Sequence, residues 1–504
     1  PNTAGTYYYQ CGNHAGMIGT ITVSATTTID LSNGNLIYYT QSADTTVSFA
    51  STANGNVYFI RTDDNSGTDR TITWPDRIKW NGGTAPTLVN NARTTDAQIF
   101  LLVTRDMGVT WYGKEVVNID PQTLSLWSWG YNQANWIGAL GQNNTTNYSS
   151  PTQVGTNTNW KELAAGAETQ NSGHLALKTD GTLWVTGENE YGVLGLNEPV
   201  SLRLSSPTQI PGDWTWKAGT QTTITNLVIK TNGTLWAWGK NSFAYGQGGG
   251  NLGQNNQISY SSPVQIPGTT WASLSKGSGG LTQFAIKTNG TLWVWGGLRS
   301  GSNRGRPGLN ETAIYSSPKQ VGTDTNWKEV GAGNATSAIK TDGTLWSWGN
   351  AGYGNIGQNA PDNSHLSSPT QVGTDTTWNT HANDNNHTFA IKTDGTLWSW
   401  GYNKDGVLGL NQRPLPGDKY SKSSPTQVGT DTTWSTLSNG TNSTMTAIKT
   451  DGTAWAWGYN YYGLNAQNTA GPTGTISSPI QIGTATNWQQ IEWQGYGAWG
   501  LRKS

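Results

Sequence analysis

Histidine and carboxylate side chains come together at one place in the sequence. The 504-residue chain contains five His, and two of them, His381 and His387, flank Asp384 in the segment H-A-N-D-N-N-H. Imidazole and carboxylate groups both bind zinc, so a metal site is one interpretation of this segment. The simpler interpretation is a polar loop between two strands. We favour it, and we expect neither a metal nor another cofactor.

Two other stretches carry acidic residues at spacings that suggest chemistry. Glu188 and Glu190 stand two residues apart, and glycoside hydrolysis uses a pair of carboxyl groups. Residues 63–69, D-D-N-S-G-T-D, alternate oxygen-bearing side chains as a calcium loop does, but the closing Glu is missing. A solvated loop and a hairpin turn explain these stretches more simply. We therefore expect no catalytic residue and no enzymatic activity.

The best candidates for direct ligand contact are aromatic and polar side chains in loops. Trp493 lies outside the phase of the repeat described below and stands three residues before Tyr496. Such a pair near the axis of a ring-shaped fold is suited to contacts with a glycan or a protein. Asn383, Asp384 and Asn385 lie in a loop whose sequence differs from repeat to repeat, as binding loops on a rigid scaffold do. We predict that these five residues bind ligand.

Composition and charge exclude several classes of protein. Lys and Arg number 29 against 30 Asp and Glu, so the net charge of −1 argues against a nucleic-acid binder. A single Cys excludes a disulfide scaffold. No stretch approaches the ~18 apolar residues of a membrane span, so we expect no membrane insertion. The 65 Gly and 27 Trp instead indicate a turn-rich, all-β protein with a tryptophan-based core.

Four sequence markers repeat from about residue 122 to residue 504. The first is L-W-x-W-G, whose leading Trp stands at positions 127, 184, 236, 293, 346, 398 and 455. The others are Ser-Ser-Pro, a lone Trp about nine residues later, and a turn of the form Lys-Thr-Asp/Asn-Gly-Thr. In two copies of the first marker, Thr186 replaces the second Trp and Ala454 replaces the Leu. Three Trp residues of the repeat region stand out of phase with these markers, Trp136, Trp214 and Trp493, and Trp499 is a candidate for a fourth.

Each repeat predicts four short strands. Asp-Gly and Asn-Gly favour tight hairpin turns because both positions tolerate positive φ, so Ala390–Gly401 predicts a hairpin. In L-W-x-W-G both Trp side chains lie on one face of the strand, with Leu and a small residue on the other. A strand that is apolar on both faces belongs to a covered sheet. Repeated four-stranded units covered by their neighbours are typical of a β-propeller.

The two ends of the repeat region complement each other. Leu124–Gly130 has no hairpin turn before it, and Tyr496–Lys503 stops where such a turn should follow. Pairing these segments completes one shared N- and C-terminal blade and closes the ring, which removes exposed strand edges. We therefore predict seven blades over residues 121–504.

The repeat resembles that of the RCC1 superfamily. The motifs G-x-N-x-x-G-x-L-G, P-x-x-V and H-T-x-A-I-K-x-D-G-x-L-W-x-W-G follow one another, and His387–Gly395 is the nearest local match. The resemblance covers about residues 122–504 and implies a seven-bladed propeller. It implies no single activity, because the superfamily includes nucleotide-exchange factors, enzyme inhibitors and adhesin-like modules.

Residues 1–120 lack the repeat and predict a small β-sandwich or jelly roll, with a boundary at Asp120–Pro121. Residues 72–88 and 96–113 resemble domains of tailed-phage virion proteins. Such domains are found in tail fibres and in head or baseplate appendages, often as trimers. The resemblance implies an anchoring or oligomerisation domain.

Together these features predict a structural appendage of a tailed phage, a tail or head fibre. Residues 1–120 would bind other virion proteins, and the propeller would recognise a host cell-surface protein or glycan. We expect a homo-oligomer, with a trimer as one option, made in the host cytoplasm and located in the virion. The alternative is a secreted or surface bacterial propeller that binds a protein as an inhibitor or adhesin. The sequence opens without a signal-peptide pattern, which weighs against it. The third option is an enzyme acting on glycans, or a nucleotide-exchange factor.

Overall fold

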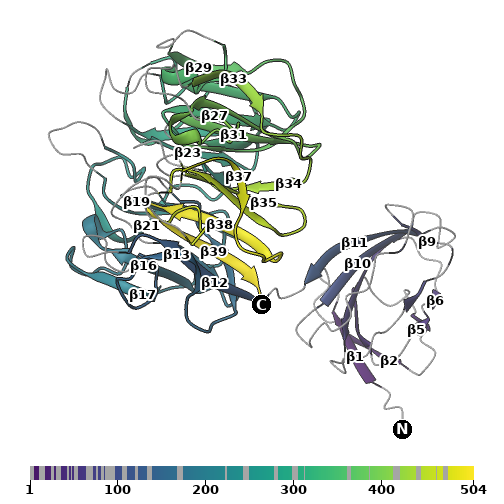
Figure 1. Cartoon of the computed structure of the whole chain (residues 1–504). Helices are drawn as coiled ribbons and strands as arrows, with labels where there is room; N and C mark the ends of the chain where they lie inside the picture. Colours follow the sequence, from purple (N-terminus) through teal and green to yellow (C-terminus); the bar gives the residue numbers. More distant parts are fainter. Residues whose placement is uncertain are drawn as a thin grey trace. The chain divides into compact units, whose positions relative to one another are not determined.

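The computed structural model divides the chain into two compact units, Pro1–Gln122 and Thr123–Ser504, each described here by itself (Figure 1). In the first unit the structure describes the strands given below and residues 74, 76 and 85. In the second it describes residues 123–132, 139–166, 174–221, 224–241, 249–276, 282–297, 305–311, 313–359, 365–384, 386–412, 421–438, 444–460, 463–468 and 475–504.

Seven four-stranded antiparallel sheets make up the second unit, which confirms the predicted seven-bladed propeller. From the innermost strand outward, the first three blades are β14 (Trp160–Leu163), β15 (Leu175–Lys178), β16 (Leu183–Glu188) and β17 (Arg203–Ile210); β18 (Trp216–Gln221), β19 (Thr225–Lys230), β20 (Leu235–Gly239) and β21 (Tyr260–Ile266); β22 (Trp271–Leu274), β23 (Thr282–Lys287), β24 (Leu292–Gly296) and β25 (Tyr315–Gln320).

The next three blades have the same order. They are β26 (Trp327–Gly331), β27 (Ala335–Lys340), β28 (Leu345–Gly349) and β29 (Leu366–Gln371); β30 (Trp378–Asn383), β31 (His387–Lys392), β32 (Leu397–Tyr402) and β33 (Ser421–Gln427); β34 (Trp434–Leu437), β35 (Thr444–Lys449), β36 (Ala454–Gly458) and β37 (Ile476–Gln481).

The seventh blade joins the two ends of the repeat region. It consists of β38 (Trp488–Gln494), β39 (Gly497–Lys503), β12 (Leu124–Gly130) and β13 (Tyr148–Gln153). β12 pairs with β39 from Leu124 opposite Lys503 to Gly130 opposite Gly497, and the two strands lie side by side in Figure 1. The predicted shared blade is therefore confirmed, and it closes the ring.

The Thr of the Asp/Asn-Gly-Thr turn forms hydrogen bonds both within the turn and to a Trp indole of the following strand. In the fifth blade, Thr396 Oγ1 donates to Asp394 Oδ1 at 2.7 Å and accepts from Trp398 Nε1 at 2.9 Å. Gly395 has φ +78°, as the predicted tight turn requires. The same hydroxyl-centred network recurs in the other blades that carry this turn, at Thr182, Thr234, Thr291, Thr344 and Thr453.

The apolar core is divided among the junctions between neighbouring blades. In the described residues, one cluster of buried side chains lies at each of the seven junctions. The second Trp of L-W-x-W-G is fully buried there and reaches the preceding blade: Trp238 Nε1 donates to the Val193 carbonyl at 2.9 Å. Each blade thus packs against, and bonds to, the one before it.

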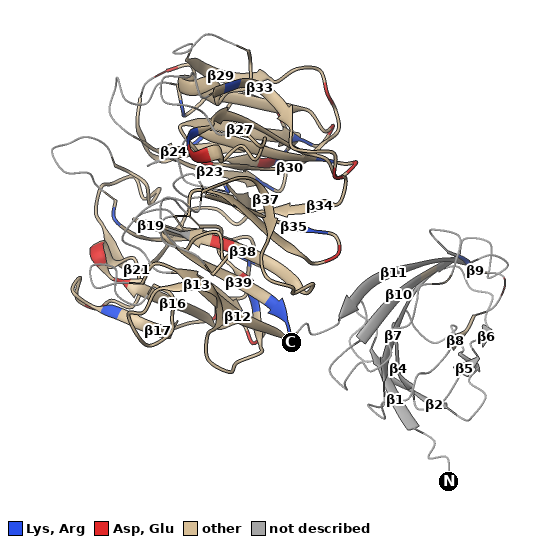
Figure 2. Cartoon of the chain, viewed as in Figure 1, with Lys and Arg blue, Asp and Glu red and all other residues tan. Residues whose placement is uncertain are grey.

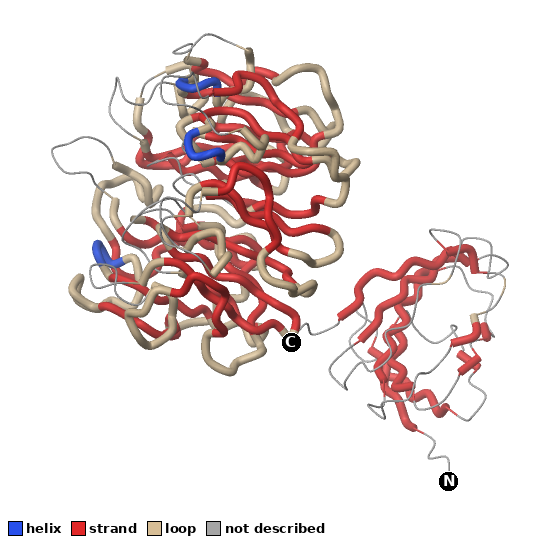
Figure 3. Tube along the Cα trace, in the orientation of Figure 1, coloured by secondary structure: helices blue, strands red, loops and turns tan. Residues whose placement is uncertain are grey.

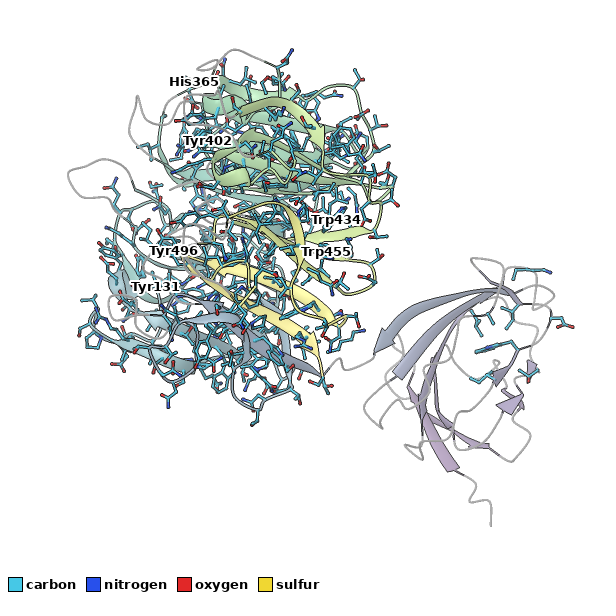
Figure 4. All side chains as sticks on the ribbon, viewed as in Figure 1. Tyr131, His365, Tyr402, Trp434, Trp455 and Tyr496 are labelled. Carbon is cyan, nitrogen blue, oxygen red and sulfur yellow. The ribbon has the colours of Figure 1, made fainter. Side chains whose placement is uncertain are left out.

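A basic side chain covers a pair of Trp rings in every blade. Lys449 Nζ lies 4.8 Å from the ring centroid of Trp434 and 3.7 Å from that of Trp455, and Figure 4 shows the two indoles near each other. In the shared blade Arg502 takes this place, over Trp127 and Trp488. Cation–π contacts therefore join the second strand of each blade to its neighbours on either side.

Helix is almost absent from the described residues. Three 3₁₀ turns, η2 (Glu190–Gly192), η4 (Gly352–Gly354) and η5 (Lys404–Gly406), are the helical segments in Figure 3. Within the described part of the chain, no helix has the length and apolar character needed to cross a membrane.

The first unit is also built from strands. A five-stranded mixed sheet has the order β4 (Leu36–Gln41), β7 (Gly55–Asp63), β10 (Ala97–Thr104), β11 (Trp111–Ile119) and β9 (Ile78–Trp80). Two-stranded pairs are β1 (Gly5–Gln10) with β2 (Ile18–Val23), β3 (Thr28–Ile29) with β6 (Ser48–Phe49), and β5 (Thr45–Thr46) with β8 (Ile72–Thr73). The sandwich or jelly-roll arrangement remains a prediction, and the calcium-loop stretch after Asp63 lies outside the described residues.

Candidate functional site

The innermost strands of the blades surround the propeller axis. They come close at their C-terminal ends, where Ala165 bridges Thr220 and Lys276 bridges Gly331 in parallel pairs. A Cβ built on Gly166 would lie 1.5 Å from the Trp493 carbonyl oxygen, so only Gly allows the backbones of β14 and β38 to approach here. Backbone contacts therefore hold the axis together at this end.

A cavity of about 330 Å³ lies among these strands. Its walls come mainly from β14, β18, β22, β34 and β38, with part of β35. The charged side chains in the lining are Glu162, Lys217, Lys276 and Glu492. Charged residues are sparse along the propeller strands, and the acidic residue of β38 in Figure 2 is Glu492. The cavity is thus one place where the neutral fold concentrates charge.

On one side of the axis, a carboxylate is fully partnered. Glu329 lies 3.2 Å from Lys276 Nζ, and it accepts hydrogen bonds from Thr380 Oγ1 at 3.0 Å and the His381 backbone N–H at 2.9 Å. His381 Nδ1 lies 3.0 Å from the same carboxylate. Burial raises the pKa of Glu329, but Lys276 and His381 outweigh burial and hold this pKa well below its usual range.

On the other side, two carboxyl groups have no basic group in direct contact, although the charges of Lys276 and Lys161 act on Glu492 and Glu162 from farther away. Burial raises the pKa of Glu492 to about 7, although Gln490 Nε2 donates to it at 3.2 Å and the Gly166 N–H at 3.4 Å. Burial also raises the pKa of Glu162, whose Oε2 accepts from Trp216 Nε1 at 2.8 Å. In the part of the chain that the structure describes, no Lys, Arg or His nitrogen lies within 4.0 Å of either carboxyl group.

Trp493 does not offer its ring to a ligand at this site. Its side chain is fully buried, packs edge-on against Trp129 at 5.9 Å, and donates from Nε1 to Thr446 Oγ1 at 3.0 Å. Trp493 lies in β38 within a blade junction, and not in a loop as expected, and its predicted role in binding stays a prediction. Tyr496 is half-buried and meets Tyr131 with ring centroids 6.4 Å apart (Figure 4). Its predicted role in binding stays a prediction.

The other predicted ligand residues are held in structural contacts. Asn383 is 1% exposed, and its amide donates to the Ala335 carbonyl at 3.3 Å. Asp384 is also buried, and its Oδ1 accepts from the Asn386 N–H and lies 2.8 Å from His387 Nδ1. Both side chains are held in contacts within the protein, and their predicted role in ligand binding stays a prediction. Asn385 lies outside the described residues.

The residues considered for metal and acid–base chemistry have separate partners. His387 pairs with Asp384, whereas His381 faces Glu329 and the Ser337 carbonyl. Within the described ranges, no group of three His, Cys, Asp or Glu side chains is arranged to hold a metal ion. Glu188 lies 3.1 Å from Arg203 Nε.

The out-of-phase Trp residues are explained by packing where the structure describes them. Trp214, not the in-phase Trp216, lies under Lys230 at 4.5 Å and against Trp236 at 5.9 Å. This frees the Trp216 indole to bond Glu162. Trp499 is fully buried as well. Trp136 lies outside the described residues.

The sequence analysis missed the axial carboxyl groups. Glu162 and Glu329 both stand two residues after a lone Trp, where the other repeats carry Ala218, Ser273, Thr380, Thr436 and Gln490. An acidic residue at a position that is otherwise small or neutral was the available signal.

Comparison with known proteins agrees with this architecture. Residues 394–447 match the family model for the regulator of chromosome condensation (RCC1) repeat. The mitochondrial RCC1 domain-containing protein RUG3 of Arabidopsis thaliana is 26% identical over 316 residues, which cover 60% of this chain and 66% of that protein. The ultraviolet-B receptor UVR8 of the same plant is 27% identical over 318 residues, 61% of this chain and 67% of the receptor. The chain thus spans about two thirds of the length of these relatives.

Two solved structures share the fold. Prp20p from Saccharomyces cerevisiae superposes with a TM-score of 0.64 at 19% identity, over 76% of this chain and 92% of Prp20p. Human WBSCR16 gives a TM-score of 0.61 at 17% identity, over 76% of this chain and 99% of that one. Residues 123–504 therefore form an RCC1-like seven-bladed β-propeller that contains an RCC1 repeat.

Proposed function

We propose that this chain is a recognition protein whose propeller binds a protein or glycan on a host cell surface. We further propose that it is mounted on a tailed-phage particle as a tail or head appendage. The first unit attaches it to other virion proteins and brings copies of the chain together.

The recognition proposal rests on a difference between the turns at one end of each blade and the loops at the other. In an antiparallel blade, the loops after the first and third strands lie at the end opposite to the turn after the second. The second-strand turns repeat one hydrogen-bond network, as at Asp394 and Thr396. The segments between the first and second strands differ in length and sequence, from residues 495–496 in the shared blade to residues 164–174 in the first. A constant scaffold with variable loops at one end is the usual construction of a binding surface.

Related propellers support protein binding by this fold. Prp20p has been studied for its binding to Gsp1p and histones, and yeast RCC1 (Prp20) has been solved with Kap60 bound. The virion location rests on the sequence of the first unit, residues 72–88 and 96–113, which resembles virion domains. Repeated weak contacts on an oligomeric appendage add up through multivalency.

Purified particles of the phage that encodes the chain provide the test. Gradient-purified virions should contain the chain in fixed stoichiometry to the capsid protein by quantitative mass spectrometry. Antibodies to the propeller should label particles at one location in electron micrographs. Absence of the chain from particles that contain every other structural protein would overturn the virion proposal.

The second candidate is a secreted or surface bacterial propeller that binds a protein partner, which the protein-binding relatives favour. The same fractionation separates the two. This candidate predicts that the chain accompanies bacterial envelope or culture medium and is missing from the particles.

A further inference from the structure

We propose that the axial cavity binds an organic cation, an alkylammonium or guanidinium group, between the carboxyl groups of Glu162 and Glu492. This inference deepens the proposed recognition function and rests on it. It names the chemical group of the partner that enters the axis.

The cavity has the size and shape for one such group. Its volume of about 330 Å³ lies at the lower limit of the roughly 300–1,000 Å³ typical of small-molecule sites. It therefore accommodates a small molecule or one long side chain. Leu163 and Leu274 supply apolar wall for an alkyl stem, and Ser275 and Ser438 supply hydroxyl groups.

The carboxyl groups around the axis differ in their partners, and Glu329 lies outside the cavity lining. Glu329 already has Lys276 at 3.2 Å and His381 at 3.0 Å, so its charge is compensated within the protein. Glu492 is 8% exposed and receives hydrogen bonds from Gln490 and Gly166, and the positive charge of Lys276 acts on it from beyond contact distance. Glu162 receives one from Trp216. Two enclosed carboxyl groups facing one cavity gain most from a cation supplied from outside, because opposite charge favours the ionised forms.

The basic groups around the cavity do not contact the carboxyl groups of Glu162 and Glu492. Lys276 is engaged by Glu329 and by Thr380 Oγ1 at 3.1 Å. Lys217 is exposed at the edge of the lining. The segments between the first and second strands of the blades carry two basic residues, Lys276 and His174, and His174 is buried with its ring on Trp499.

The cation has two possible sources, a free polyamine or a basic side chain of a protein partner. Both present the same group to the carboxylates. A basic side chain of a protein partner is attached to a polypeptide backbone, whereas a free polyamine is not. A peptide should therefore bind only if its backbone fits at the mouth of the cavity. Separate probes distinguish the two sources.

Isothermal titration calorimetry on the full chain tests the proposal with n-butylamine, spermidine and a capped Gly-Gly-Arg-Gly-Gly peptide. We expect binding at one site per chain for butylamine, and no heat with the uncharged analogue n-butanol. Glu492→Gln and Glu162→Gln should each weaken butylamine binding at least tenfold. Glu311→Gln, which changes an exposed acid outside the cavity, should leave it unchanged.

The proton balance gives a second readout. At pH 6 the buried Glu492 carboxyl holds a proton in the free protein, and a bound ammonium favours its carboxylate form. Titrations in buffers of different ionisation enthalpy should show proton release on binding, and Glu492→Gln should reduce it. If that variant does not fold, Glu162→Gln carries the affinity test.

Equal affinities of the parent chain, Glu162→Gln and Glu492→Gln would overturn the inference, as would equal binding of butylamine and butanol. Binding of spermidine without the peptide assigns a free polyamine, and binding of the peptide assigns a protein side chain. A chain present in virions that binds no cationic probe refutes this inference and leaves the proposed function standing.

Discussion

The indole of Trp499 stacks on the imidazole of His174, with ring centroids 4.7 Å apart and ring planes inclined by 13°. Trp499 belongs to the shared blade and His174 to the next one, at the junction where Thr186 replaces the second Trp of the motif. A Cβ on Gly141 would meet the Trp499 ring at 3.1 Å, whereas the equivalent Gly195 meets Trp238. Trp499 therefore fills the space that the missing Trp leaves.

The hydroxyl of Thr186 keeps the missing indole's hydrogen bond. Its Oγ1 donates to the Ala139 carbonyl at 3.1 Å, as Trp238 Nε1 does to Val193 in the next blade. Restoring the motif with Thr186→Trp should overpack the junction and cost about 1–3 kcal/mol of unfolding free energy. Trp499→Phe introduces the residue that two other blades carry at the equivalent position, Phe284 and Phe389. The smaller ring should leave space for the new indole at position 186.

A double-mutant cycle by urea denaturation of the full chain measures this coupling. We expect Thr186→Trp and Trp499→Phe each to destabilise, and the double variant to recover at least about 1 kcal/mol relative to their sum. Thr344→Ser, far from this junction, serves as the additive control with Trp499→Phe. Simple additivity of the first pair would show that the two rings do not share one space.

The stability of the fold should fall in acid through His174. Burial lowers the pKa of His174 to about 3, against 6.5 when exposed. Between these values the unfolded state binds more protons, so unfolding free energy decreases as pH falls below 6.5. From pH 6.5 to 5 this amounts to about 2 kcal/mol, at about 1.4 kcal/mol per pH unit.

His174→Phe keeps an aromatic ring against Trp499 and removes the titrating group. Between pH 7 and pH 5, the unfolding free energy of the parent should fall relative to that of the variant by about 2 kcal/mol. Carboxylates titrate equally in both proteins and cancel. A pH-independent difference would place a proton on the folded imidazole.

Glu492 should have the opposite effect. Its pKa is raised to about 7 from 4.5, so the folded state binds more protons over that range and stability falls as pH rises. Glu492→Gln removes a penalty of about 1.4 kcal/mol per pH unit between these values. We expect the variant to melt higher than the parent at pH 8, with a smaller or reversed difference at pH 4.5. Thermal melts at both pH values, with Glu311→Gln as the control, check the sign.

The basic residue between paired Trp rings should be replaceable only by another cation. Lys287 Nζ lies 3.8 Å from the Trp293 centroid and 4.8 Å from that of Trp271. Lys287→Met should cost about 0.5–2 kcal/mol. Lys287→Arg should cost less, because Arg502 occupies the same position in the shared blade. Equal losses for both variants in chemical denaturation would show that side-chain shape, and not charge, matters here.

The hairpin glycine should tolerate no side chain. A Cβ on Gly395 would lie 1.9 Å from the Thr432 carbonyl oxygen, and the residue has φ +78°. Gly395→Ala should therefore cost more than about 1 kcal/mol, because it combines a disfavoured dihedral with a backbone clash. Gly429 has φ +62° with nothing within 4 Å, so Gly429→Ala isolates the dihedral effect. A smaller loss for Gly395→Ala than for Gly429→Ala would contradict the close approach.

Local sequence patterns were sufficient for most of the propeller. The Asp-Gly turns define hairpins such as Ala390–Gly401, and the incomplete ends at Leu124 and Lys503 define the closing blade. These are signals between residues close in sequence, or between the two ends of one repeat pattern. Their physical basis is the φ preference of turn residues and the need to pair every strand edge.

Local sequence patterns did not predict which side chains of the innermost strands face the propeller axis. A bulge after Trp160 places Lys178 opposite Trp160 and Leu177 opposite Glu162. Strict alternation counted from the Trp assigns Glu162 to the same face as Trp160, whereas the bulge turns it to the other. The sequence does not signal this extra residue, so the carboxyl group at the axis was missed.

The sequence by itself determined the repeat, its strands, the number of blades and the pairing of the two chain ends. Only the tertiary structure decided that Trp493 is buried, that Trp499 replaces an absent ring, and that Glu162 and Glu492 line one cavity. Gln490 bonds the backbone of Leu163 across 327 positions of sequence. Contacts of this range depend on how all seven blades pack into a closed ring, a property that no local pattern encodes.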